Sequence, residues 1–355
     1  MVPLIAYASR QSARPGETVE IKVSSACSRP YHADFVRLLS ADPNPQGPGL
    51  RYEAVPAGFA GAYPSRVQAI ESGSCCDIRL RQALPGQGWT FSIRVQPWLL
   101  DDAWQAIAAM SGEAELAVLA NARETAIVFG SGQRLALPAM ELLRWYEIRL
   151  QIDDGSAIFG LVPIDPKQGK ASFASAQMID GGTFGRVMLA ATFAADGQRI
   201  GHFNGRLEDP AFLRPARLDA RPLDLESRTE AEILHWWDFS LDIPTATVRD
   251  RGAGRCDGIL VNLPTRGVCG SRWRGSEMAW RHAPREYASI HFHEDDLYDC
   301  NWETDFTVAL PVGTPSGIYA IRLRCEDAEE LLPLYVLPAH GAPAAPIALL
   351  VPTLT

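Results

Sequence analysis

The chain has 355 residues, 47% hydrophobic and 21% charged, a composition that excludes intrinsic disorder and is typical of a globular chain with more than one core. A formal net charge of -9 and a sequence pI near 5.3 give no attraction to phosphate backbones or anionic lipid, so we expect no nucleic-acid partner. No apolar run reaches the roughly 18 residues of a membrane helix and the first residues lack a secretory signal, so we expect a cytoplasmic protein with no membrane partner.

The first block of the chain has the signals of an antiparallel β-sandwich. Residues 4–9 and 19–24 are predicted strands joined by a Pro-Gly turn, and residues 31–39 are a third. Residues 41–61, rich in proline and glycine, are predicted to be irregular. We therefore expect an immunoglobulin-like sandwich over residues 1–86.

The middle of the chain alternates short strands with turns at even spacing. Asp-Asp-Gly at 153–155 and Ala-Asp-Gly at 195–197 are typical hairpin turns. A short helix is predicted at 224–234, where Ser227 is a candidate N-cap. Such even strands favour a laminin-G or concanavalin-like jelly roll over residues 87–250.

The last block of the chain has the strand signals of a further all-β domain, followed by a linker and an apolar segment. Strand signals recur through residues 251–338, which we expect to form a second immunoglobulin-like sandwich. An Ala/Pro/Gly linker then leads to IALLVPTLT, an apolar strand of the kind that parallel sheets bury. Because such a strand without partners would be an aggregation hazard, residues 339–355 are predicted to be a linker and the first strand of a following α/β domain.

The cysteines do not indicate a disulfide framework. All seven lack a CxxC spacing, and the chain is too large to need such cross-links, so we expect free thiols. The adjacent Cys75 and Cys76 leave open a vicinal disulfide or a metal site. No GxSxG nucleophile motif occurs. A cysteine nucleophile stays open as an alternative, with Cys269 or Cys300 paired with His282, His291 or His293.

A candidate metal site lies in the late run His-Phe-His-Glu-Asp-Asp. On a strand, His291 and His293 would share one face with Cα atoms about 7 Å apart, and Asp295 could add an oxygen ligand. The alternative is a strand that runs into a solvated acidic loop, with both histidines packed at an interface.

Calcium and carbohydrate are two other ligands that the sequence suggests. A calcium ion could take oxygen atoms from a nearby acidic set, although the spacing matches no EF-hand loop. That set is Asp295, Asp296, Asp299, Glu303 and Asp305. A jelly roll also suggests carbohydrate binding, which would need exposed aromatic side chains. The tryptophans that fit core packing at least as well are Trp98, Trp104, Trp145, Trp236 and Trp237.

Three segments in the same order resemble one known family. They are RPGETVEIKVS near the start, HFNGRLEDPAF in the middle, and LVNLPTRGVCGSRWRGSEMAWRHAPREYASIHFHEDDLYDCNWETDF late in the chain. Together they resemble the N-terminal, non-catalytic part of the large (beta) subunit of N,N-dimethylformamidase and its relatives. The resemblance covers essentially the whole chain, but none of the segments is an active-site signature.

The resemblance implies the following function. In that family a C-terminal α/β domain holds an iron ion on tyrosine, histidine and glutamate side chains and hydrolyses the C–N bond of a formamide. A small helical subunit completes a hetero-oligomer. We therefore expect this chain to be the scaffold of an amide hydrolase, inactive alone, with no cofactor and no catalytic residue of its own. The alternatives are a stand-alone lectin-like protein and a metallohydrolase built on His291, His293 and Asp295.

Overall fold

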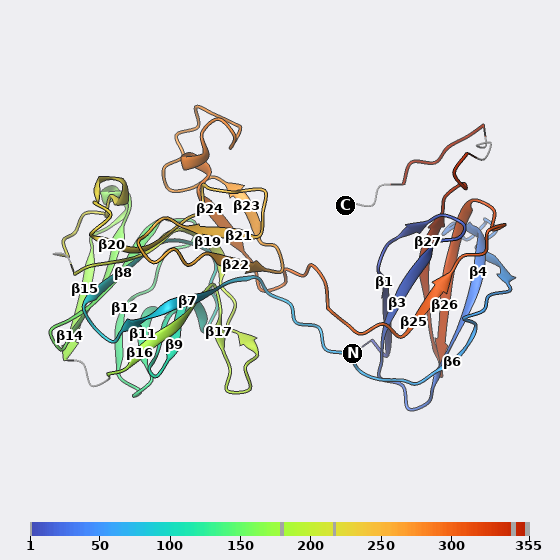
Figure 1. The fold of residues 1–355 in the computed structure, drawn as a ribbon, viewed down its shortest axis with the longest axis horizontal. Helices are drawn as coiled ribbons and strands as arrows, with labels where there is room; N and C mark the ends of the chain where they lie inside the picture. The colour runs from blue at the N-terminus through green and yellow to red at the C-terminus, as the bar shows by residue number, and fades with distance from the viewer. Residues whose placement is uncertain (1, 178–180, 216–217, 342–345, 352–355) are drawn as a thin grey trace. The chain divides into compact units, whose positions relative to one another are not determined.

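The computed structural model describes residues 2–177, 181–215, 218–341 and 346–351, and almost all regular structure in them is β-strand (Figure 1). The helices in these residues are short 3-10 turns: η1 Pro166–Gln168, η2 Leu225–Ser227 and η3 Pro284–Tyr287. None of them is long and apolar enough to cross a membrane. The predicted all-β class is confirmed.

The chain divides into two compact units. The terminal unit combines residues 1–70 with residues 299–355, and the middle unit comprises residues 71–298. The middle unit is therefore inserted, in sequence, between the two parts of the terminal one.

The terminal unit contains two β-sheets. One is antiparallel, in the order β1-β3-β25, and the other has the order β2-β27-β26-β4-β5, with β6 also paired to β4. The strands are β1 Leu4–Ala8, β2 Ser12–Ala13, β3 Thr18–Ser25, β4 Tyr31–Ala41, β5 Leu50–Val55, β6 Gly61–Tyr63, β25 Phe306–Ala309, β26 Gly317–Cys325 and β27 Ala328–Val336.

The period-2 pattern of these strands explains the sandwich. In β3, Val19, Ile21 and Val23 alternate with more exposed residues and are buried in one core with Phe35 of β4 and Ile321 of β26. One face of each sheet is thus apolar, so the two sheets stabilise each other by burying these faces together.

The pairing of these strands corrects the expected division into domains. β3 pairs with β25 and β4 pairs with β26, so the strands predicted as sandwiches at 1–86 and 251–338 form one sandwich. The parts of these ranges that lie between residues 71 and 298 belong to the middle unit. Alternation of apolar residues predicts where a strand lies, but it carries no information about a partner so distant in the chain. The region 41–61 also contains the short strand β5, which we had expected to be irregular.

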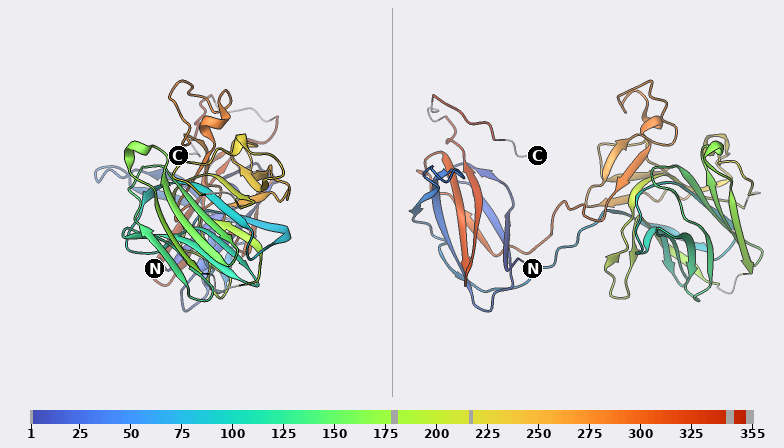
Figure 2. Two further views of the ribbon diagram at one scale, coloured as in Figure 1. Left: turned by 90° about the vertical axis from the view of Figure 1, so that its left-hand side faces the viewer. Right: turned by 180° about the vertical axis from the view of Figure 1, so that it is seen from behind.

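The middle unit is built on a long, folded β-sheet. Its strand order is β12-β11-β10-β9-β16-β7-β22-β21-β20-β19-β8-β13-β14-β15, with β24 paired to β19 and β23 paired to β24. Figure 2 (left) looks onto neighbouring strands of this sheet. A separate hairpin consists of β17 Thr192–Phe193 and β18 Arg199–Ile200. The sheet strands are β7 Cys75–Pro85, β8 Trp89–Leu99, β9 Gln105–Gly112, β10 Glu115–Ala120, β11 Glu124–Phe129, β12 Arg134–Pro138, β13 Tyr146–Asp153, β14 Ser156–Pro163, β15 Ser172–Gln177, β16 Thr183–Leu189, β19 Asn204–Leu213, β20 Ile233–Asp238, β21 Thr247–Asp250, β22 Gly258–Val261, β23 Thr265–Val268 and β24 Ser289–Phe292.

A single hydrophobic core lies between two arms of this sheet, one that contains β9 and β10 and one that contains β8 and β13. Ile107 of β9 and Val118 of β10 lie in one buried cluster with Phe91 of β8 and Ile148 of β13. Each arm therefore buries one face against the other, as in a two-layer sandwich. The Asp-Asp-Gly turn is also confirmed: Asp154 and Gly155 have φ values of 47° and 68°, the left-handed pair of a two-residue hairpin.

The predicted helix at 224–234 is reduced to η2. The Asp224 side chain, not Ser227, accepts the N-terminal hydrogen bond, from the Glu226 N–H. Strand β20 begins only a few residues later and carries Trp236 and Trp237 into the interior. Tertiary burial of that strand overrides the local helix signal.

The predicted strand at the chain end is absent from the described residues 346–351. Ile347, Leu349 and Leu350 are all strongly exposed there. Residues 352–355, the rest of that prediction, lie outside the described part.

Candidate functional site

The two histidines of the predicted metal site do lie side by side. His291 is in β24, His293 follows that strand, and their ring centroids are 4.1 Å apart with an angle of 36° between the planes. The ring centroid of Trp98 lies 4.6 Å from that of His291, and the Arg206 guanidinium lies 4.6 Å over the Trp98 ring. The two imidazoles face each other ring to ring, which is the geometry of packing rather than of nitrogens converging on one ion.

The surroundings of His291 disfavour its charged form. Burial lowers the pKa of His291 to about 4, and the charges of His293 and Arg206 act in the same direction. Its buried Nε2 atom has no hydrogen-bond partner among the described residues. The carboxylate near His293 is Asp296, at 3.4 Å from Nδ1, whereas Asp295 is exposed.

The acidic residues predicted as calcium ligands belong to different units, and several of them already accept hydrogen bonds. Asp296 belongs to the middle unit and accepts a hydrogen bond from the Ser74 hydroxyl at 2.6 Å. Asp299 and Asp305 belong to the terminal unit and accept hydrogen bonds from the Tyr7 hydroxyl and the Val23 N–H.

All seven cysteines are free thiols, as predicted. Burial raises the pKa of Cys75 to about 12, so the adjacent pair Cys75 and Cys76 is unreactive at neutral pH. Within the described residues, no contact joins the thiol of Cys269 or Cys300 to a histidine.

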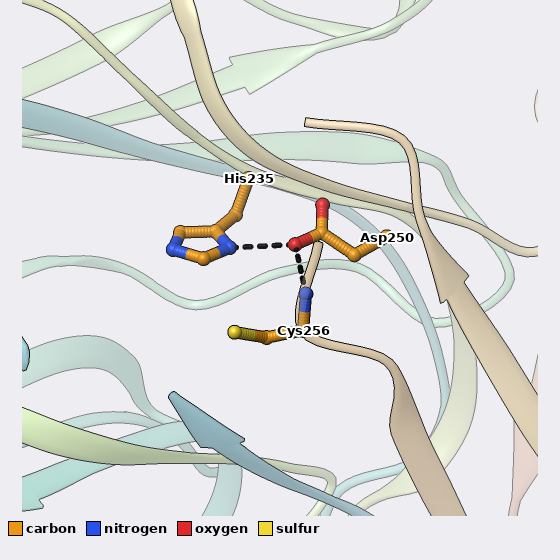
Figure 3. Close-up of side chains that lie close together, drawn as sticks. All are labelled: His235, Asp250 and Cys256. Carbon is orange, nitrogen blue, oxygen red and sulfur yellow. Dashed lines mark hydrogen bonds and ion pairs between the residues drawn. The ribbon is translucent and has the colours of Figure 1, made fainter. Parts of the chain in front are cut away.

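A different cluster in the described residues brings together three side chains whose ligand atoms lie within 4.8 Å of one another, close enough to hold a metal ion. It consists of His235 in β20, Asp250 at the end of β21 and Cys256 in the loop before β22, all buried (Figure 3). The His235 imidazole stacks on Trp237, with ring centroids 5.3 Å apart and planes 4° from parallel.

Asp250 is the centre of this group. Its Oδ1 accepts hydrogen bonds from the backbone N–H of Trp236 at 2.9 Å and of Gly252 at 2.8 Å. Its Oδ2 accepts one from the Cys256 N–H at 2.8 Å and is 2.7 Å from Nδ1 of His235. Burial alone would raise the pKa of Asp250, but these hydrogen bonds outweigh it and hold the pKa below the usual value. The carboxylate is therefore ionised, and Nδ1 of His235 carries the proton that it donates.

The glycines of the loop DRGAGRC make room for this arrangement. A Cβ atom at Gly254 would lie 1.9 Å from Cε1 of His235, and one at Gly252 would lie 2.4 Å from the His235 Cα atom. The loop can thus wrap around the imidazole only because both positions lack a side chain.

This geometry disfavours a metal ion at Asp250 and a reactive thiol at Cys256, but it leaves Nε2 of His235 available to a ligand. All four acceptor positions of Asp250 are occupied, so a metal ion would have to displace existing hydrogen bonds. The Cys256 thiol donates to the Gly254 carbonyl at 3.3 Å and accepts the Arg81 N–H at 3.1 Å, so it is held as a structural thiol. Nε2 of His235 has no partner in the described part of the chain and is free to bind a ligand.

His235 and Cys256 also line a groove with a volume of about 490 Å³. The other residues along it come from β7, from the turn after β7, from the segment after β19, from β20 and from the loop between β21 and β22. They are Arg81, Gln82, Ala83, Leu84, Pro85, Gly88, Arg214, Leu234, Ala253 and Gly254.

A buried ion network lies elsewhere in the middle unit and fixes the segment between β23 and β24. Glu208 and Asp209 of β19 are almost completely buried, and Nη1 of Arg272 is 2.6 Å and 2.5 Å from their carboxylates. Arg285 reaches Asp238 at 2.9 Å. Burial and the neighbouring Asp209 charge raise the pKa of Glu208, while Arg272 and Arg285 offset burial and lower the pKa of Asp209. These charges are paired and have a structural role.

The sequence patterns did not single out His235, Asp250 and Cys256. They are spread over two strands and a loop, and the histidine sits in an aromatic run typical of a core strand. The signal that could have found them is the close spacing of Asp250, Gly252 and Gly254 before a cysteine, which indicates a tight loop around a carboxylate.

The comparisons with known proteins cover nearly the whole chain. The N,N-dimethylformamidase beta subunits of Alcaligenes sp and Paracoccus aminophilus are each 31% identical, over 98% and 99% of this chain. The family described as N,N-dimethylformamidase beta subunit-like, C-terminal, matches residues 265–355. The chain spans about half the length of both relatives, 51% of each.

Solved structures give weaker similarities. A carbohydrate-binding candidate from Bacteroides ovatus ATCC 8483 is 12% identical, covers 72% of this chain and 95% of its own, and has a TM-score of 0.37. The LG1-3 region of the laminin alpha2 chain is 9% identical, covers 90% and 74%, and has a TM-score of 0.31.

Proposed function

The chain is a relative of the N,N-dimethylformamidase beta subunits over nearly its whole length, and we propose that it forms the non-catalytic scaffold of a related amide hydrolase. The observation that carries this proposal is the match at 31% identity, over nearly the whole of this chain, to about half of each relative. Hydrolysis of the amide C–N bond is then a property of the assembled enzyme, to which this chain contributes its β-sandwiches.

The geometry of the described residues supports a scaffold role. The predicted histidine pair is packed ring against ring, the buried carboxylates of β19 are paired with arginines, and the Cys256 thiol is hydrogen-bonded on both sides. None of these groups combines a nucleophile, a base and a place for substrate.

We place the iron of the enzyme outside this chain. In the family that the sequence resembles, the ion is held by tyrosine, histidine and glutamate. The group with metal-ligand chemistry in the described residues is His235, Asp250 and Cys256, and its carboxylate is saturated with hydrogen bonds. The donor set does not fit, and no step of the reaction is assigned to it.

We further propose that the chain works in a hetero-oligomer. Both relatives are named as beta subunits, which implies a second kind of subunit in those enzymes. By analogy, the partners here are the chain or domain that carries the iron site and a small helical subunit.

The test is to purify the protein under native conditions from its source and to compare it with the isolated 355-residue chain. We expect iron and hydrolysis of N,N-dimethylformamide or another simple amide in the native assembly, and neither in the isolated chain. Amide hydrolysis by the isolated chain, or a native assembly with no amide hydrolase activity, would contradict the proposal. Native mass spectrometry and metal analysis supply the composition.

One observation favours a second candidate, carbohydrate binding. Trp98 and Trp104 were expected in the core but are 41% and 38% exposed, and Trp98 lies next to the polar groups of Gln96 and Arg206. Partly exposed aromatic side chains with hydrogen-bonding neighbours suit sugar rings. A glycan array on which the chain gives no signal, or gives the same signal after Trp98→Ala, would remove this candidate.

A further inference from the structure

We propose that the groove beside His235 is a binding site for small carboxylates that carry an apolar group. The inference goes beyond the scaffold function and does not rest on it. It follows from three features of the groove: a free imidazole nitrogen with a carboxylate behind it, two arginines at the rim, and an apolar wall.

His235 supplies a buried, oriented polar atom. The side chain is 5% exposed, its ring is fixed by stacking on Trp237, and Nδ1 donates to Asp250 at 2.7 Å. Nε2 has no hydrogen bond within the described residues, although its ring lines the groove. Nε2 is thus an unpaired polar atom at the wall of the groove, held in place by the stacking of the ring and by the hydrogen bond of Nδ1 to Asp250.

The rim of the groove carries positive charge. The Arg81 guanidinium has no ion pair or hydrogen bond among the described residues, and Arg214 uses only its Nε–H, on the Ala231 carbonyl at 3.0 Å. Free guanidinium groups bind carboxylates through paired N–H donors. The carboxylate of Asp250 is ionised, but its four hydrogen-bond donors stabilise the charge and so weaken its repulsion of a second anion.

A β-bulge in β7 lies beside the groove. The pairing of β16 with β7 jumps from Phe184 opposite Leu84 to Arg186 opposite Arg79, so residues 80–83 bulge out of the sheet. The Arg81 N–H released by the bulge donates to the Cys256 thiol, which ties the bulge to the loop around His235. Bulges of this kind re-aim side chains and are common beside functional sites.

The rest of the wall is apolar. Leu84, Pro85 and Leu234 line the groove together with Ala83 and Ala253. A volume of about 490 Å³ is sufficient for a ligand of roughly ten non-hydrogen atoms. An aromatic or branched aliphatic carboxylate therefore fits both the charge and the surface of the groove.

The test uses the full chain and two probes of the same shape, benzoate and its uncharged analogue benzamide. Binding is measured by ligand-observed NMR at fixed ionic strength. We expect saturable binding of benzoate, about tenfold tighter than benzamide, and about fivefold weaker benzoate binding by R81Q and by R214Q. Arg255→Gln, which changes a neighbouring arginine that does not line the groove, should bind benzoate as the wild type does.

Both arginine substitutions are at exposed positions, so the variants are expected to fold, and circular dichroism confirms this for each. Equal affinity for benzoate and benzamide would overturn the proposal, as would the absence of saturable benzoate binding. Loss of affinity in R255Q equal to that in R81Q would show only a general charge effect and would overturn it as well.

Discussion

Nδ1 of His235 lies 2.7 Å from Oδ2 of Asp250, and the same carboxylate accepts hydrogen bonds from the backbone N–H of Trp236 in β20 and from two N–H groups of the loop before β22. This single side chain therefore links β20, β21 and the loop before β22. The first prediction follows from that link.

Replacing Asp250 with asparagine should destabilise the middle unit by about 3 kcal/mol. The amide keeps one acceptor oxygen, and its NH₂ group would face donors that the carboxylate now satisfies. Urea unfolding followed by tryptophan fluorescence measures the loss. Asp102→Asn, at an exposed ion pair with Arg123, is the matched control and should change the free energy of unfolding by less than about 1 kcal/mol.

Gly254→Ala should lower the stability of the middle unit by more than the small size of the added methyl group suggests. The added methyl would lie 1.9 Å from Cε1 of His235, so the ring must leave its place between Gly254 and Trp237. We expect a loss of at least about 2 kcal/mol and a changed NMR resonance of the His235 ring. Gly185→Ala is the control, because a Cβ atom there meets nothing within 4 Å. Equal stability of the two variants would refute the assigned packing.

His291 should titrate far below an ordinary histidine. Burial lowers its pKa to about 4 from 6.5, and His293 and Arg206 add to the effect. The unfolded chain therefore takes up this proton first, so the folded state loses stability as the pH falls from about 6.5 to about 4. The loss amounts to roughly 3 kcal/mol, since each pKa unit corresponds to about 1.4 kcal/mol.

An NMR titration of the His291 ring checks this directly, with an expected midpoint near pH 4. His291→Phe should remove this part of the pH dependence of unfolding, whereas His282→Phe, at an exposed position, should leave it. A midpoint near 6.5 for His291 would show that the cluster with Trp98 and Arg206 is solvated.

Arg272→Met should release the segment between β23 and β24. The substitution leaves Glu208 and Asp209 buried with one cation fewer, and breaking a buried pair in this way typically costs about 3–5 kcal/mol. We expect rapid proteolysis within residues 269–287, detected by mass spectrometry. Arg123→Met removes an exposed pair instead and should leave the cleavage rate unchanged.

Much of the fold was accessible from local patterns, because side-chain alternation and turn chemistry are local. The strand at Val19–Ser24 and the Asp154-Gly155 hairpin were predicted on those grounds and are confirmed. The domain division was not accessible, since it depends on the pairing of Val36 with Ala320, and no local pattern encodes a partner at that distance.

The candidate site could be predicted from local sequence patterns even less than the domain division. His291 and His293 were singled out because they are two residues apart on one face of a predicted strand, and the structure places them together but ring against ring. His235, Asp250 and Cys256 meet only after β20 and β21 pair and the glycine loop closes. The sequence shows residue types and spacing, whereas the direction in which a ring nitrogen points depends on the tertiary packing around it.

The insertion of the middle unit between two parts of the terminal one also has a consequence for synthesis on the ribosome. Strands β3 and β4 leave the exit tunnel early, but their partners β25 and β26 follow only after the whole of residues 71–298. At typical elongation rates of about 5–20 residues per second, the edges of β3 and β4 stay unpaired for tens of seconds. Exposed strand edges attract other chains. During that interval the edges that will later pair with β25 and β26 are open to other chains, so the nascent protein passes through a period of raised aggregation risk.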